Sequence, residues 1–243
     1  MSLVRTAKHA PTRGRDIEIR VAVLPPGERI KPYVDGVEEI TVANAGSEVA
    51  KGATSIPVTA LTANVIKIAK GQVIRFVDQT TGKEYLAYVS EDATAGDASL
   101  SVDALDEAIP DTAVGEFPAY VWDRTDSSVS KSYSFSGVTT YNSGDNEDGT
   151  NTGSTSDMTL PGIDYHYNDG LKSVIEAAKL GQEFWVTRTK PAPNDAFERG
   201  ELKEGAATIA NDNDGAPADA FQSRDIDVKF VGAVTDLRAK PKA

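Results

Sequence analysis

The chain has 243 residues and a mass of 25.8 kDa, enough to bury a sizeable apolar core in one large domain or two small ones. It has no cysteine and two histidines, which excludes disulfides, thiolate metal sites and cysteine nucleophiles and leaves little room for histidine chemistry. The formal charge of -12 argues against sequence-specific binding of nucleic acid, because an acidic surface repels phosphates.

The sequence has neither a run of about 20 apolar residues nor an apolar signal core at its start. We therefore expect a cytosolic chain, or a particle component assembled in a cytosol, that does not bind membranes.

Both ends of the chain are basic, so the negative charge is concentrated between them. Residues 1–15 lack acidic side chains and carry Arg5, Lys8, Arg13 and Arg15. Residues 238–243 are basic in the same way. Such ends are typical either of arms that reach acidic neighbours or of flexible, solvated termini.

Period-two patterns predict a β protein. The first strand is expected at 17–23, where every second residue is Ile or Val. Further runs rich in β-branched and aromatic residues predict strands at 73–78, 84–90, 119–124 and 131–141.

The middle of the chain contains an internal duplication. Residues 52–61 align with residues 96–105 at an offset of 44, and five of the ten positions are identical. Ile56 aligns with Leu100.

Each copy predicts a short strand, at 54–58 and at 98–102, ahead of a polar loop. Two copies are too few for a solenoid. We therefore predict a small β-barrel or sandwich built from a duplicated half at 43–118, inserted into a domain formed by 1–42 and 119–243.

Two long polar stretches follow. Residues 142–157 combine glycines with four acids and hold no apolar residue, which predicts a loop that is functional or disordered. Residues 211–219 predict a second polar loop.

One segment has helical periodicity. Leu171, Val174, Ile175 and Ala178 share one helical face, so we predict a helix at 169–180. Asn168 or Asp169 would cap its start, and Gly181 would end it.

The remaining elements follow the helix. We predict strands at 183–190 and 226–232, and a weaker helix around 197–203.

The search for chemistry finds no catalytic motif: the nucleophile-elbow, phosphate-loop and zinc-helix patterns are all missing. His9 lies in a basic end, and His166 is interpreted as part of a packed strand end. The acidic runs 145–149 and 211–215 resemble calcium loops but fail the ligand spacing. Paired carboxylates for glycoside hydrolysis stay open, although the pattern has little specificity. We expect no enzyme activity, no cofactor and no bound metal.

Four aromatic residues could form a sugar-stacking platform or simply pack in the core, which we favour: Tyr120, Trp122, Phe184 and Trp185.

From Asp164 onward, the sequence resembles the C-terminal half of the tail tube proteins of long-tailed bacteriophages. The resemblance rests on the helix at 169–180, the strand that follows it, the stretch Gly-Glu-Leu-Lys-Glu-Gly-Ala-Ala-Thr-Ile at 200–209 and the alternating strand at 224–234. Residues 14–23 look like the first strand of the same fold, and the duplicated middle is similar to small β modules inserted in phage structural proteins.

This resemblance implies a mainly β, tail-tube-like sandwich or barrel with one flanking helix and an inserted small β-barrel. It implies subunits that form stacked six-membered rings around an acidic channel for DNA, and that meet a sheath, terminator or baseplate protein. The loop 142–157 would be disordered in a free subunit and ordered against a neighbouring ring, and the inserted unit would lie outside the channel. We expect inter-subunit contacts from Arg5, Lys8, Arg13, Arg15, Asp145, Glu147, Asp148 and Asp157.

Two alternatives stay open at this point. One is a head decoration or head–tail connector protein, which would form trimers or a single ring. The other is a carbohydrate-binding β module that uses Trp122 or Trp185.

Overall fold

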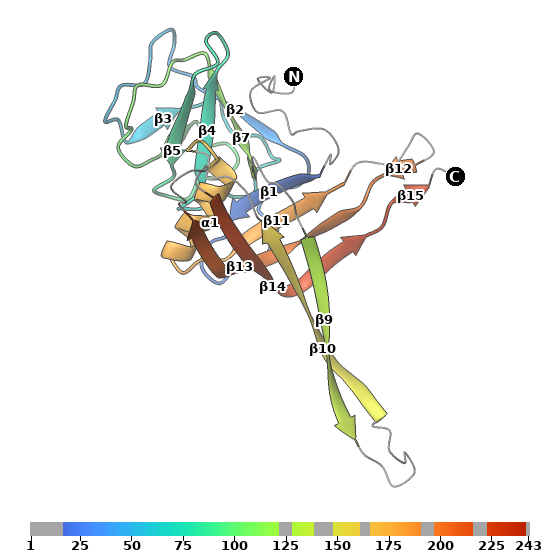
Figure 1. The fold of residues 1–243 in the computed structure, drawn as a ribbon. Coiled ribbons are helices and arrows are strands. Elements are labelled where there is room, and N and C mark those ends of the chain that lie inside the picture. Colours follow the sequence, from blue (N-terminus) through green and yellow to red (C-terminus); the bar gives the residue numbers. More distant parts are fainter. Residues whose placement is uncertain are drawn as a thin grey trace.

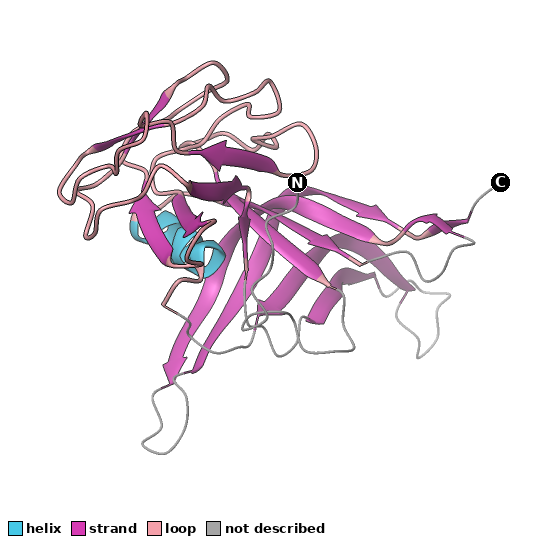
Figure 2. Cartoon of the chain, turned by 90° about the horizontal axis from the view of Figure 1, so that it is seen from above, coloured by secondary structure: helices cyan, strands magenta, loops and turns pink. Residues whose placement is uncertain are grey.

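The computed structural model describes residues 17–121, 128–138, 148–160, 166–190, 197–215 and 223–241. These residues form a mainly β protein with one helix in the described chain, as the sequence predicts. A seven-stranded and a four-stranded antiparallel sheet make up most of it (Figure 1 and Figure 2).

The seven-stranded sheet joins strands from distant parts of the sequence. Its order is β8 (Ala119–Tyr120), β1 (Glu18–Val23), β11 (Phe184–Thr189), β13 (Leu202–Gly215), β14 (Ser223–Leu237), β10 (Asp148–Leu160) and β9 (Ser128–Val138). A separate short pair joins β12 (Phe197–Arg199) to β15 (Lys240–Pro241). The strands predicted at 17–23, 183–190 and 226–232 are confirmed as β1, β11 and part of β14.

Alternation along these strands gives the sheet one apolar face. Val21 stands opposite Val186 in the β1–β11 ladder, and Met158 stands opposite Val228 in the β10–β14 ladder. These four side chains are buried in one cluster with residues of the helix. Because side chains alternate across a strand, the residues between them point to the opposite face.

The helix α1 (Asp169–Lys179) covers the apolar face and confirms the prediction to within one residue. The Asn168 side chain accepts a hydrogen bond from the Leu171 N–H at 3.0 Å, which caps the first turn. Gly181, with φ 67°, takes the left-handed conformation just after the helix. At the other end, a Cβ on Gly170 would lie 2.6 Å from the Tyr120 carbonyl oxygen, so only glycine lets α1 approach β8 this closely.

The four-stranded sheet has the order β2 (Glu38–Thr41), β7 (Ala113–Phe117), β4 (Val73–Asp78) and β5 (Glu84–Tyr88). Beside it, β3 (Ser55–Pro57) pairs with β6 (Ser99–Ser101). We call residues 38–117 the module, and the seven-stranded sheet with α1 the body. The module has its own buried apolar cluster. The predicted domain limits at 43 and 118 stay a prediction.

The two copies of the duplicated segment pair with each other. Ile56 and Leu100, aligned by sequence, are opposite one another in the β3–β6 ladder. The Gly52 N–H donates to the Leu105 carbonyl at 2.9 Å, and the Gly96 N–H donates to the Leu61 carbonyl at 2.8 Å. If the two copies are exchanged at their offset of 44 residues, Gly52 becomes Gly96 and Leu105 becomes Leu61, so each bond turns into the other. The copies are therefore related by an approximate two-fold axis.

Three sequence predictions need correction. The weaker helix around 197–203 is wrong, because β12 occupies 197–199 and β13 begins at Leu202. Pairing of β13 with strands on both sides outweighs the helix propensity of its first residues. The polar loop at 211–219 is wrong over 211–215, which pair with the first residues of β14.

The third correction concerns 142–157: residues 148–157 belong to β10 and pair with β9. Ladder hydrogen bonds come from the backbone, so a strand can form without apolar side chains. The threonines at 150, 152 and 155 were the available signal, since β-branched residues favour strands.

Candidate assembly interface

Two of the eight predicted contact residues lie among the residues that the structure describes. Arg5, Lys8, Arg13, Arg15, Asp145 and Glu147 lie outside the described residues. Asp148 and Asp157 are both on β10, at opposite ends of its ladder with β9: Asp148 stands opposite Val138, and Asp157 stands opposite Ser130. The structure therefore places these two residues far apart along the same strand.

Strands β9 and β10 form a two-stranded ribbon that projects from the body (Figure 1). Their pairing runs from Asp148–Val138 to Thr159–Ser128, whereas β14 pairs only with residues 157–160 of β10. Residues 148–156 therefore have one neighbouring strand, β9, which is itself the edge of the sheet. We call residues 128–138 and 148–156 the ribbon.

The sheet face opposite the core is acidic where the ribbon leaves it. Asp157 stands opposite Lys229, and Thr159 stands opposite Asp227. The Thr159 hydroxyl donates to Asp227 Oδ1 at 2.9 Å. Asp225 is exposed two residues before Asp227, on the same face by alternation. Three carboxylates and one lysine thus share this part of the face.

An ion pair closes the nearby end of the β13–β14 hairpin. Arg224 donates Nε and Nη2 to the two carboxylate oxygens of Asp212, at 2.8 and 2.7 Å. These hydrogen bonds lower the pKa of Asp212 below its usual value. Asp212 lies in the part of β13 that the sequence predicts to be a loop, and Arg224 lies in β14.

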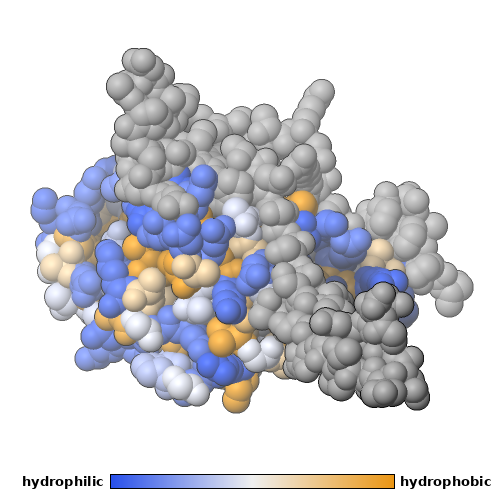
Figure 3. Space-filling view, turned by 60° about the horizontal axis from the view of Figure 1, so that its bottom comes forward, coloured by the Kyte–Doolittle hydropathy of each residue, from blue (hydrophilic) through white to orange (hydrophobic). Residues whose placement is uncertain are grey.

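A second surface feature is a set of exposed apolar side chains, which we call the apolar patch: Ile30, Val34, Val37 and Ile66. Val34 and Ile66 are 60% and 49% exposed. Their segments are hydrogen-bonded, because the Val34 N–H donates to the Asn64 carbonyl and the Ile66 N–H to the Pro32 carbonyl. On the face drawn in Figure 3, hydrophobic and hydrophilic residues lie side by side.

Among the residues considered for chemistry, those that the structure describes do not form a site. His166 is exposed and meets Tyr167 edge to face, and His9 lies outside the described residues. Tyr120 and Phe184 are buried and Trp185 packs against the module core, so these three do not form an exposed platform. Trp122 also lies outside the described residues.

Within the described ranges, no group of three His, Asp or Glu side chains could hold a metal. No helix in that part of the chain is long and apolar enough to span a membrane.

The sequence matches no known family model and no curated protein. The fold is similar to that of several solved structures, among them the following three. A chain of the virion of a native gene transfer agent particle is 13% identical with a TM-score of 0.39, and the match covers 49% of this chain and 87% of that one. A chain from the tail of an empty gene transfer agent particle, which has C6 symmetry, is 13% identical with a TM-score of 0.39, covering 49% and 84%.

A chain of the six-fold symmetrised baseplate of the anti-feeding prophage is 6% identical with a TM-score of 0.38, covering 68% and 91%. These neighbours are components of tail and baseplate particles. At such identities and scores, the function has to be argued from this chain's own contacts.

Proposed function

We propose that this chain is a structural, self-assembling subunit of a phage tail tube, without catalytic activity. The observation that carries the proposal is the ribbon. A two-stranded ribbon is marginally stable in water by itself, and its outer strand presents unpaired backbone N–H and C=O groups. Residues 148–156 pair with no third strand of the described chain. A neighbouring subunit would supply the missing layer.

The other edge of the sheet differs from the ribbon. It ends in β8, which has two residues, is buried and pairs with Arg20 and Val21 of β1. The ribbon is therefore the unpaired edge, and a neighbouring subunit in a ring would cover it. A contact between two different surfaces of identical subunits is heterologous, and it generates rings or filaments.

The charge of the molecule fits passage of DNA. The chain carries a net charge of -12, and three carboxylates share the outer face near the ribbon. A negatively charged bore repels phosphates, so that DNA slides and does not adhere. Six subunits per ring, and sheath, terminator or baseplate partners, belong to this proposal through the resemblance stated for the sequence.

The test is the mass and shape of the purified protein over a wide concentration range. We expect rings or stacked tubes with a central channel in electron micrographs, and a native mass near six subunits. A chain that stays monomeric at high concentration would contradict the proposal. Trimers, or single rings that never stack, would instead favour the head decoration or connector function.

A further inference from the structure

Gln72 is a fully buried polar residue where the module, β1 and α1 meet. Its Oε1 accepts a hydrogen bond from the Val23 N–H at 2.8 Å. Its Nε2 donates to the Ser173 hydroxyl at 2.9 Å and to the Val73 carbonyl at 3.1 Å. One side chain of the module thus contacts both a strand and the helix of the body.

The position of Val23 explains why this bond matters. The Leu24 N–H donates to the Glu183 carbonyl at 2.9 Å, on the side of β1 next to β11. Successive N–H groups of a strand point to opposite sides, so the Val23 N–H points to the side of β8. However, β8 pairs with β1 only at Arg20 and Val21. The Gln72 amide supplies the acceptor that a longer β8 would have provided, and a buried N–H without an acceptor is costly.

Ser173 extends the contact to the helix. Its hydroxyl oxygen accepts a hydrogen bond from the Val73 N–H at 2.9 Å and donates to the Asp169 carbonyl at 2.7 Å. Ser173 is fully buried, so water does not replace these partners. The first residue of β4 and the first turn of α1 are therefore held by one hydroxyl.

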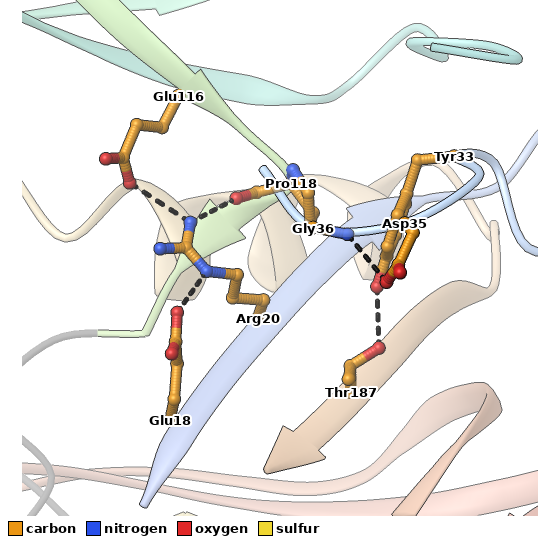
Figure 4. Close-up of polar contacts among 8 residues, drawn as sticks. All are labelled: Glu18, Arg20, Tyr33, Asp35, Gly36, Glu116, Pro118 and Thr187. Carbon is orange, nitrogen blue, oxygen red and sulfur yellow. Dashed lines mark hydrogen bonds and ion pairs between the residues drawn. The ribbon is translucent and has the colours of Figure 1, made fainter. Parts of the chain in front are cut away.

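A second group of polar contacts joins the same parts (Figure 4). Arg20 of β1 donates Nη1 to Glu116 Oε2 at 3.1 Å and to the Pro118 carbonyl at 2.9 Å, which ties the body to the end of the module. Just before the module in sequence, Tyr33 packs in the module cluster, and its hydroxyl lies 2.6 Å from the Thr187 hydroxyl of β11. The two apolar clusters also interlock, because Ala22 of β1 packs in the module cluster and Ala69 of the module packs in the body cluster.

We infer that the module and the body form one cooperative folding unit, in which Gln72 is the residue that couples them. The module provides a side-chain acceptor for the backbone of β1, and it holds α1 through hydrogen bonds to Ser173. It is therefore a part of the body's fold and not a detachable decoration. This inference does not depend on the proposed assembly, since all of its contacts lie within one chain.

The test compares Gln72→Leu with Gln79→Leu in the full chain, by hydrogen exchange and thermal unfolding. Gln79 is an exposed residue just after β4. Its side-chain amide donates to the nearby Val77 carbonyl and does not join the module to the body, so its replacement is the matched control. We expect Gln72→Leu to speed exchange of the Val23 amide about tenfold or more, and to split or broaden a single unfolding transition. The control should behave like the native chain.

Ser173→Ala removes only a hydroxyl. It is the second test variant, to be used if Gln72→Leu does not fold. It should speed exchange on both sides of the junction, at Val73 in the module and in the first turn of α1. Loss of protection on one side alone would overturn the inference. So would two separate unfolding transitions in the native chain.

Discussion

At the scale of single residues, Asp169 is the most unusual titratable group described. It begins α1 and is almost fully buried. Burial raises the pKa of its carboxyl from 3.8 to about 7, although Arg75 and Arg20 oppose the shift. Glu84 pairs with Arg75 at 2.8 Å, and Glu116 with Arg20, so the nearby guanidinium charges are already shared. Glu18 and Tyr120 also contact Arg20, and three further charged or titratable residues are close to Asp169 in the sequence: His166, Tyr167 and Lys172.

The sign of the resulting pH effect follows from linkage. The folded state keeps the proton more tightly than the unfolded state, so Asp169 makes the free energy of unfolding fall as pH rises from about 4 to about 7. We expect Asp169→Asn to remove that slope and to be more stable than the native chain at about pH 8, by a few kcal/mol at most. Denaturant unfolding across this pH range is the measurement. Parallel stability curves for the two proteins would refute it.

At the scale of elements, the ribbon should be dispensable for folding but required for assembly. Replacing residues 133–154 by Asn-Gly joins Ser132 to Thr155, which already stand opposite each other, through a two-residue hairpin turn. The retained part of β10 keeps its pairs with β14 at 157–160.

We expect the shortened chain to melt close to the native temperature and to remain monomeric where the native chain assembles. Calorimetry and sedimentation measure the two effects separately. Rings formed by the shortened chain would remove the ribbon from the assembly mechanism.

At the scale of the whole molecule, the apolar patch is a second candidate contact surface. Val34 and Ile66 are well exposed in the single chain, so charges there should cost little folding stability. We expect the double variant Val34→Asp, Ile66→Asp to weaken self-association about tenfold or more, because a charge buried in an interface loses its hydration. The control Thr59→Asp, Ala60→Asp adds the same charge at exposed positions of the module. Equal association of the two double variants would exclude the patch.

The sequence predicts those elements that a local pattern of apolar residues specifies. Leu171, Val174 and Ile175 predict α1 because their spacing matches the helical period, and β1 follows from an equally regular alternation. The duplication predicts a unit built from two related halves, and the structure adds that Ile56 and Leu100 stand opposite each other.

Contacts that depend on distant partners escape this kind of reasoning. The polar strand β10 is specified by its ladder with β9 and not by a hydrophobic pattern. Gln72 is indistinguishable in sequence from an exposed glutamine, since its partners Val23 and Ser173 come from far along the chain. The long polar run at 142–157 therefore predicts a loop, although ten of its sixteen residues, 148–157, form a strand.

The two copies in the module make equivalent hydrogen bonds to each other. The Gly52–Leu105 and Gly96–Leu61 bonds are the same contact made twice, so each half carries a surface that recognises its own duplicate. That is the isologous geometry of a homodimer, here tethered by a linker. A peptide containing only one half would expose this surface and dimerise through it.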